Sequence, residues 1–408
     1  MADVKKTPYY KPQKGLLKSE LKEYKGAQGC IPLDTQKTVS IDRLAPGEKP
    51  LPPPPPPPKP VIKAPETPKQ PPAPKQAPKA APSKADVPPK QAEAEVCENP
   101  PPFDLQDVPI AMDKLGWKVS AKLARIWFAS PEHIYNDDPK SIQPIDDSDV
   151  TLDWTLKFGS VRQKYDKFLS EDIYSERSVA IAKEKIAPFV SKLFNDRNSS
   201  FSFNTAPFVK NLLKFHTDWQ FQYLPIGNWD TLENLAPNDL TGALANFNIY
   251  AAVGNVEISA EKYFKYEKTT NLYCLNAVAK ITHIYVYVKD NYSFNGKQYL
   301  GHWNKHGVII APGSVLFDFS SLKRDSDVDI WMKALDKPVD IRKSLIGKFK
   351  ESDVYFPVHN ADYNRWREKH HRGGDFMIYS KPVYLKLKKP IEIKLGEICR
   401  VEPSNSLA

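Results

Sequence analysis

The stretch CLNAVAKITHIYVYVKD, residues 274–290, decides the fold class. It is rich in β-branched and aromatic residues, which favour extended strands. A stretch of the same kind, ANFNIYAAVGNVEIS, precedes it at 245–259, and shorter ones follow in GVIIAP, DVYFPV and DFMIYS. The last, VYLKLKKPIEIKL, alternates apolar and charged residues, which predicts an edge hairpin with Pro390 at its turn. We therefore predict a mostly antiparallel sheet over about 241–404.

The region before this sheet is predicted to be helical. Apolar residues recur at helical spacing in AMDKLGWKVSAKLARIWF, residues 111–128, and Ser130-Pro131 ends that pattern. Further helices are predicted at 177–195 and after Asn204. Helices over about 103–240 followed by a sheet define the α+β class, here as one domain from 103 to 404. We expect the aromatic side chains of these helices to form core, and we expect no cofactor.

Residues 1–102 have a different composition. They contain 25 of the 39 prolines and neither Phe nor Trp, so they cannot bury enough apolar surface to offset the entropy of ordering. We predict a disordered tail with a polyproline rod at LPPPPPPPKP, residues 51–60. The tail is interpreted as a spacer, or as a ligand for a proline-reading groove or an arm that docks on a partner. Within it, CIPLDTQKTVSIDRL at 30–44 is expected to form a strand or a docking peptide.

The charge and the start of the chain limit the function classes. The formal charge is +9, but the tail has 17 Lys+Arg against 11 Asp+Glu and the remainder 41 against 38, so the folded part is nearly balanced. This balance disfavours nucleic acid as a partner. The start, MADVKKTPYY, lacks the apolar segment of a signal peptide, and no apolar run is long enough for an integral membrane span. We expect synthesis in the cytoplasm and, if the protein is exported, a route that reads no cleavable signal.

The four cysteines, at 30, 97, 274 and 399, lack the spacing of a zinc site. We interpret them as reduced thiols, with a Cys274–Cys399 bridge as the alternative, and we expect no metal. Signature motifs of P-loop nucleotide binding, dinucleotide binding, α/β hydrolases and zincin proteases are absent from the sequence. These enzyme classes are therefore disfavoured.

The first candidate site segment is KDNYSFNGKQYLGHWNKHG, residues 289–307, directly after the strongest predicted strand. A strand end fixes polar groups while the following loop exposes them. We expect Asp290, Tyr292 and Asn295 to share one opening with His302 and His306. The alternative is a simple turn at Asn295-Gly296, a strong hairpin signal.

The second candidate segment is VHNADYNRWREKHHRGGDF, residues 358–376. Asn360 or Asp362 is predicted to cap a short helix that Gly373-Gly374 ends, with Trp366 facing the core. His359 and Asp375 lie at the two ends of this helix and suit acid–base chemistry, because a carboxylate can orient a histidine. Candidate binding residues of the segment are Asn360, Arg365, Arg367, His371 and Arg372.

Two segments, DNYSFNGKQYLGHW at 290–303 and NADYNRWREKHHRGGDF at 360–376, resemble motifs of a bacterial family of unknown function. Its members carry Asp-x-Tyr-Asp-Phe-Asn-Gly-x-Gln-x-Leu-Gly-x-Trp and Trp-Arg…Gly-Gly-Asp-Phe, and the resemblance covers roughly 105–400. Ser293 replaces the second Asp, so a catalytic role there would pass to Asp290. Such proteins are often encoded near type VI secretion genes, which implies an effector, with an immunity protein as partner, or a part of the delivery apparatus. The resemblance also implies that the Pro-rich tail binds a secretion apparatus or adaptor. A looser similarity links the chain to colicin M type lipid II hydrolases, from which it departs at Ser293 and Trp303.

Three functional hypotheses follow. The first is a secreted antibacterial effector with a hydrolase-like toxin domain, in which His302 or His359 is the acid–base group, Asp290 or Asp375 orients it and Arg367 holds an anion. The second is a non-enzymatic structural or adaptor protein of a secretion or phage-like assembly. The third is a nuclease or nucleic-acid binder that uses the basic residues between 365 and 372.

Overall fold

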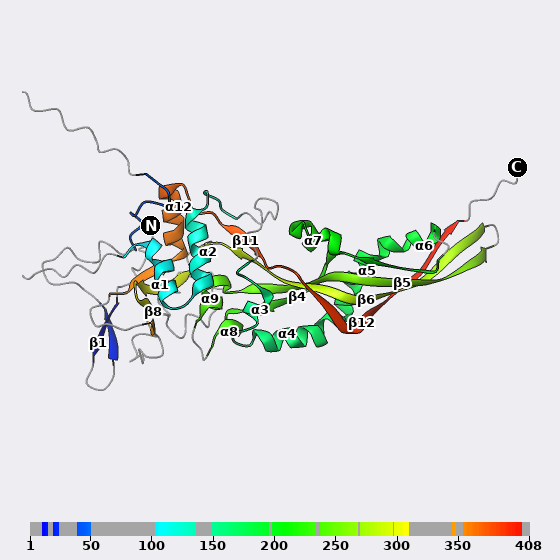
Figure 1. Cartoon of the computed structure of the whole chain (residues 1–408), viewed down its shortest axis with the longest axis horizontal. Coiled ribbons are helices and arrows are strands. Elements are labelled where there is room, and N and C mark those ends of the chain that lie inside the picture. Colours follow the sequence, from blue (N-terminus) through cyan, green and yellow to red (C-terminus); the bar gives the residue numbers. More distant parts are fainter. Residues whose placement is uncertain are drawn as a thin grey trace, which may run out of the picture.

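The computed structural model describes residues 10–14, 19–23, 39–49, 103–135, 148–195, 198–233, 237–267, 270–296, 298–309, 345–347 and 354–401. Figure 1 shows an elongated molecule in which a helical head lies at one end of a long, twisted blade of strands. The predicted polyproline rod, most of the predicted tail, Cys30 and Cys97 lie outside the described residues. The predicted α+β class, with helices followed by a largely antiparallel sheet, is confirmed.

The blade is built on one long antiparallel hairpin, β5 (Phe247–Glu267) and β6 (Thr270–Tyr292). Two strands lie along the outer edge of β5, namely β4 (Gln220–Ile226) and β3 (Ser200–Asn204). Two others lie along the outer edge of β6, namely β11 (Phe376–Tyr379) and β12 (Val383–Val401). The register shifts around Gly254, where an added Cβ would lie 2.7 Å from the carbonyl oxygen of His283, so this close approach of the strands requires glycine.

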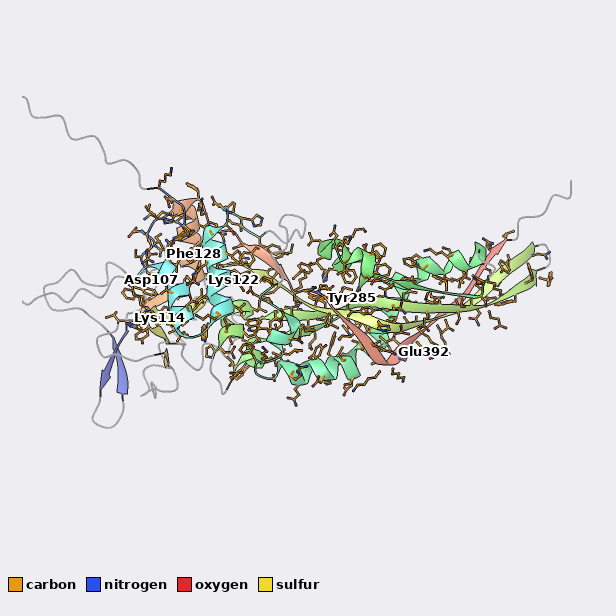
Figure 2. All side chains as sticks on the ribbon, viewed as in Figure 1. Asp107, Lys114, Lys122, Phe128, Tyr285 and Glu392 are labelled. Atoms are coloured by element: carbon orange, nitrogen blue, oxygen red, sulfur yellow. A yellow bond between two sulfur atoms is a disulfide. The ribbon has the colours of Figure 1, made fainter. Side chains whose placement is uncertain are left out.

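Helices pack along both sides of the blade (Figure 1). They are α3 (Leu152–Thr155), α4 (Val161–Ser170), α5 (Glu176–Val190), α6 (Lys192–Asn195), α7 (Leu212–Trp219) and α8 (Asn228–Thr231), with short 3-10 turns at Asp172–Tyr174 and Ala206–Phe208. Because helices cover it, the central stretch of β6 is buried on both faces, as Tyr285, Val286 and Tyr287 show. Figure 2 places Tyr285 in the middle of this packed region.

The head combines helices with a small second sheet. Its helices are α1 (Val108–Lys114), α2 (Lys118–Ala129), α9 (Asp239–Leu244) and α12 (Asn360–His370), preceded by a 3-10 turn at Leu105–Asp107. Its antiparallel sheet has the order β10 (Phe356–His359), β7 (Tyr299–Asn304), β8 (Gly307–Ile309), β9 (Leu345–Gly347). Trp366, predicted to face the core, is fully buried, beside Trp127 and Phe128 (Figure 2 labels Phe128).

Several element boundaries differ from the sequence-based expectation. The single helix predicted over 111–128 is two helices, because Gly116 adopts a φ of 83° between α1 and α2. The helix expected directly after Asn204 begins only at Leu212. Strands β3 and β4 lie inside the region predicted to be helical.

The predicted edge hairpin around Pro390 is wrong. Residues Val383–Val401 form one strand, β12, that pairs with β6 along almost its whole length. Pro390 lies where the register shifts between Lys386 and Ile391, so the missing N–H falls in an irregular part of an edge strand. The chain does not turn back there, because β6 offers a partner on both sides of the irregularity.

Residues 39–49 include the end of the 30–44 stretch and pack against the head, although they lie in the tail predicted to be disordered. Val39 and Ala45 are buried against the head, and Ser40 forms a parallel bridge with Asp104. The Arg43 guanidinium lies 2.8 Å from the buried Asp107 carboxylate. This segment therefore packs as part of the head although it is separated from it in sequence. A separate antiparallel pair, β1 (Tyr10–Lys14) and β2 (Ser19–Glu23), precedes it.

The interpretation of Cys274 and Cys399 as reduced thiols is wrong. The two residues are directly opposite each other on β6 and β12, and their sulfurs form a disulfide. Facing positions on antiparallel strands bring Cβ atoms close enough for this bond. The alternative of a bridge between the two is confirmed, and it ties the edge strand of the blade to its central hairpin.

Candidate functional site

A cavity of about 220 Å³ lies where the head meets the end of β6. Its wall includes Asp290 and Tyr292 from the first predicted segment and Asn360 from the second. Most of the remaining wall comes from α1 and the nearby Trp117, from α8 and the residues around α9, and from β7, including Leu300 and Trp303. The two segments, some sixty residues apart in the chain, therefore meet at one cavity.

Asp290 lines this cavity, and no other described residue of the wall is acidic. Part of its surface is exposed, but its carboxyl is surrounded by protein atoms. Burial raises the pKa of Asp290 to about 8, although the N–H of Asn291 and the charge of Lys289 act in the opposite direction. Burial also favours the neutral form of the neighbouring Lys289, because it lowers the pKa of that ammonium group. Near pH 7 the Asp290 carboxyl is thus mostly protonated and can give up a proton.

Aromatic rings form much of the wall beside Asp290. The Tyr292 ring stacks on the Phe376 ring with 4.9 Å between their centroids, and the Phe294 ring stacks on the Tyr363 ring with 3.7 Å between theirs. Burial raises the pKa of both tyrosines, Tyr292 and Tyr363, so their hydroxyl groups stay protonated. The wall therefore offers ring faces and neutral hydroxyl groups.

Asn360 fixes the geometry between the two segments. Its side-chain amide donates to the carbonyl oxygen of Asn295 at 2.7 Å, and its backbone N–H donates to the carbonyl of Gln298 at 2.8 Å. The helix that it begins is capped by Asp362, which accepts the N–H of His359 at 2.7 Å. The predicted turn at Asn295-Gly296 is present, with a φ of 73° at Gly296. Turn and site are thus parts of one arrangement.

The backbone at the end of α9 is strained where it lines the cavity. Ala245 has φ 51° and ψ −98°, a region that residues with a Cβ rarely adopt. Such strain persists only where the surroundings enforce it, and it is frequent at functional sites. Here the Asp239 carboxylate of α9 accepts the N–H groups of Val119 and Ser120 at 3.1 and 2.9 Å, which holds α9 against the first turn of α2.

The predicted histidines lie behind the cavity wall. His302 is buried in β7, and its Nδ1 forms a hydrogen bond with the hydroxyl of Tyr299, a residue that lines the cavity. The His359 ring lies 5.4 Å from the Tyr299 ring, and its Nδ1 is 3.6 Å from Asp362. His302 therefore contacts the wall residue Tyr299 through a hydrogen bond and His359 contacts it through its ring, and neither imidazole is part of the wall.

Asp375 and Arg367 form a buried ion pair away from the cavity wall. Arg367 Nη2 is 2.5 Å from Asp375, and the carboxylate also accepts from Trp127 Nε1 at 2.9 Å and from the N–H of Tyr135 at 3.1 Å. Gly373 allows this contact, because a Cβ there would lie 2.5 Å from the Trp127 ring. The left-handed residue that ends α12 is His371, with φ 50°, rather than the predicted glycines. The Gly-Gly-Asp motif thus joins the C-terminal ends of α12 and α2.

The remaining basic residues of α12, and the two that directly follow it, also have partners inside the protein. Arg365 bonds Asp362 at 2.6 Å, His371 lies 3.4 Å from Glu132, and Arg372 donates to the carbonyl of Pro46 at 2.8 Å. Lys369 pairs with Asp42 at 2.5 Å, which lowers the pKa of that carboxyl. Two of these contacts, at Pro46 and Asp42, hold residues 39–49 on the head.

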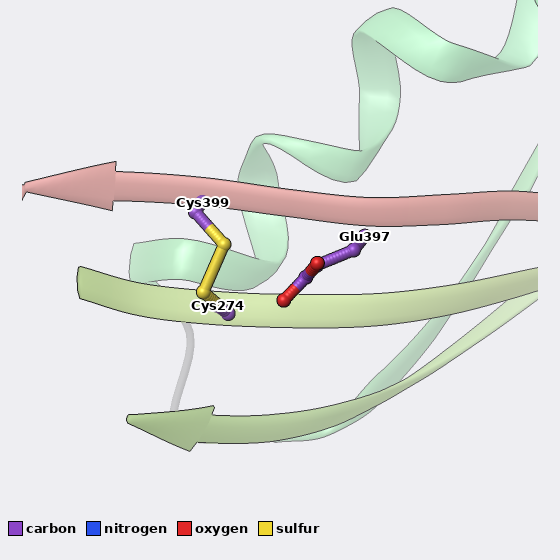
Figure 3. A group of neighbouring side chains, drawn as sticks. All are labelled: Cys274, Glu397 and Cys399. Carbon is purple, nitrogen blue, oxygen red and sulfur yellow. A yellow bond between two sulfur atoms is a disulfide. The ribbon is translucent and has the colours of Figure 1, made fainter. Parts of the chain in front are cut away.

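Among the described residues, one group of potential metal ligands is close enough to share an ion: Cys274, Cys399 and Glu397 (Figure 3). Both sulfurs are joined to each other, so neither is a thiolate, and thiolates are what bind metals. Glu397 accepts from the hydroxyl of Tyr263 and lies 3.6 Å from Lys265. The group is therefore a cross-strand disulfide with an adjacent ion pair.

Several residues of the cavity wall were not predicted from the sequence. Asn291 and Tyr363 lie inside the two quoted motifs but were read only as their context. Asn228 comes from the predicted helical region, where the sequence carried no signal for it, and the strained Ala245 is the first residue of the strand stretch predicted at 245–259. Asn291 had one sequence signal, its position directly after Asp290 at the end of the strongest predicted strand, where polar groups are held in place.

These features define an α+β protein whose cavity combines one protonated carboxyl, amide groups and aromatic rings at the end of a central strand. Residues 103–395 match the family model described as "Family of unknown function (DUF6402)". This match spans most of the chain, and the protein belongs to that family. No curated protein and no solved structure matches the chain. In the part of the chain that the structure describes, no helix is long and apolar enough to cross a membrane.

Proposed function

We propose that the protein is an antibacterial effector of a secretion system and that the cavity at Asp290 is its hydrolytic site. The observation that supports this proposal is the meeting of both motif segments, through Asp290, Tyr292 and Asn360, at one cavity. A protonated carboxyl in a partly apolar cavity is suited to general acid catalysis at neutral pH.

In this proposal Asp290 gives its proton to the leaving atom of the substrate while the scissile bond breaks. A water molecule supplies the hydroxide that bonds to the other fragment, and the remaining proton of that water returns to the Asp290 carboxylate. Tyr292 and Asn360 position the substrate beside this carboxyl. His302 and His359 stay predictions as acid–base groups, and they would act through Tyr299. Asp375 and Arg367 support the site by fixing α12.

The test is expression of the chain in bacteria, directed either to the cytoplasm or to the periplasm. We expect growth inhibition in one compartment and its loss in Asp290→Asn, which keeps the size of the side chain but removes the acid. Asp166→Asn, at an exposed position on α4, is the matched control and should stay inhibitory. Growth inhibition by Asp290→Asn equal to that of the parent would contradict the assigned role, provided both accumulate equally.

The adaptor alternative rests on a different observation, the end of the blade beyond the helices (Figure 1). Phe264 and Tyr266 on β5 and Val401 on β12 are large apolar residues that are 48%, 76% and 62% exposed. Exposed apolar side chains grouped at one end of a molecule are typical of a binding surface. An adaptor would retain a partner in pull-downs that Tyr266→Ser weakens, and it would inhibit growth in neither compartment.

A further inference from the structure

The cavity is close to electrically neutral. Among the described residues that line it there is no Lys, Arg or His, and Asp290 is the acidic residue. Burial keeps that carboxyl mostly protonated near pH 7, since its pKa is raised to about 8. A charged ligand would lose its hydration here without gaining a counter-ion, which is unfavourable. The wall is therefore suited to an uncharged ligand.

Two asparagines give this neutral wall unused hydrogen-bonding capacity. Asn228 and Asn291 both line the cavity, and each has a buried side-chain oxygen without a hydrogen-bond partner among the described residues. Buried polar atoms are normally paired, because an unpaired one loses its interaction with water and gains nothing. Oxygen acceptors are complementary to hydroxyl and amide N–H donors. The ligand that fits them carries several such donors.

Aromatic rings and size narrow the ligand further. Trp117 and Trp303 lie edge to face, with 6.2 Å between their ring centroids, and both line the cavity with Tyr292. The faces of such rings are negative and attract weakly positive C–H groups. The volume of about 220 Å³ is below the range of about 300–1,000 Å³ that is typical of pockets for drug-sized ligands. One small ring with apolar faces and a polar rim matches both observations.

We propose that the cavity binds a single neutral sugar ring, with Asn228 and Asn291 accepting its hydroxyl or amide hydrogens and an aromatic side chain covering one of its faces. The protonated Asp290 carboxyl donates to a ring or linking oxygen. This inference rests on the proposed function, because it names the substrate class of the same site.

The test uses the full chain, titrates it with glucose, galactose and N-acetylglucosamine, and follows the intrinsic tryptophan fluorescence, to which Trp117 and Trp303 contribute from the cavity wall. We expect saturable binding of at least one of the three sugars and none of inorganic phosphate at the same concentrations. Asn228→Ala and Asn291→Ala should each weaken binding tenfold or more. Asn276→Ala, at an exposed position on the same strand as Asn291, should leave it unchanged.

Folding and protonation are checked separately. Far-ultraviolet circular dichroism at increasing temperature shows whether each alanine variant keeps the parent's melting transition. In the parent, binding should weaken above about pH 8, where Asp290 loses its proton, whereas Asp290→Asn should bind equally from pH 6 to 9 because its amide still donates. Absence of saturable binding by all three sugars, or equal affinity in folded Asn291→Ala, would overturn the inference.

The two proposals fail in distinguishable ways. If the parent binds sugar and Asp290→Asn inhibits growth as strongly as the parent, the ligand is a sugar but Asp290 is not the acid of a hydrolysis. If Asp290→Asn loses growth inhibition and the parent binds no sugar, Asp290 keeps its role as the acid and the proposed ligand class is wrong.

Discussion

The head and the blade are held together by different interactions. The head buries charged side chains, among them Asp107, Arg367 and Asp375, and pairs each with a specific partner. The blade buries aliphatic and aromatic side chains along β5 and β6, and its polar residues lie mostly at the surface. Apolar packing tolerates many arrangements, whereas a buried ion pair requires one geometry. The head is thus the region whose shape depends on exact contacts, and it contains the cavity.

The largest effect that this comparison predicts comes from Arg367. Arg367→Met leaves the buried Asp375 carboxylate without its cation, and breaking a buried pair in this way typically costs about 3–5 kcal/mol. We expect the free energy of unfolding, measured with urea, to fall by that amount.

The control is Lys214→Met in the blade, which removes an exposed pair with Asp218 on α7. Exposed pairs contribute about 0–1 kcal/mol, so this variant should unfold almost as the parent does. If the two variants were equally stable, the head would not depend on its ion pair as we argue.

The blade has its own specific constraint, the Cys274–Cys399 disulfide. It closes a loop across a sequence separation of 125 residues, and disulfides typically contribute about 2–4 kcal/mol. Because Cys399 is exposed, a reductant has access to the bond. We expect dithiothreitol to lower the melting temperature of the parent but not that of a Cys274→Ala/Cys399→Ala variant. Thiol titration checks that the reductant has freed both cysteines. If the melting temperature of the parent is then unchanged, the disulfide does not stabilise the edge strand β12.

The central strand of the blade was predictable from the sequence, because its signal lies in neighbouring residues. The alternation and composition of 274–290 are properties of neighbouring residues, so β6 was recognisable without its partners. The single long β12 was missed because Pro390 is a local turn signal, and only pairing with β6 overrides it. Strands β3 and β4 were missed because their shared partner, β5, lies elsewhere in the chain.

The site was predictable only in part for the same reason. Asp290, Tyr292 and Asn360 were identified because their motifs group polar residues beside strands, and the structure brings them together. Asp375 and Arg367 have the residue types of a catalytic pair, and sequence spacing cannot show that Trp127 and the N–H of Tyr135 already occupy the carboxylate. Asn228 reaches the cavity only through the fold of α8 and α9.

The smallest effect, when expressed per pH unit, concerns Asp290 and connects the stability of the head with its chemistry. The folded protein raises the pKa of this carboxyl from 3.8 to about 8, so between these values the folded state holds a proton that the unfolded state has released. The free energy of unfolding should therefore fall as pH rises from about 4 to 8, by at most about 1.4 kcal/mol per pH unit, and level off above 8.

Other groups titrate in the same range, and the comparison of parent with Asp290→Asn cancels them. The variant should lack this slope, and Asp166→Asn, which leaves the cavity intact, should keep it. Parallel curves for parent and Asp290→Asn would mean that the head leaves this carboxyl as it is in water, and a general acid at neutral pH would then have to be sought elsewhere in the head.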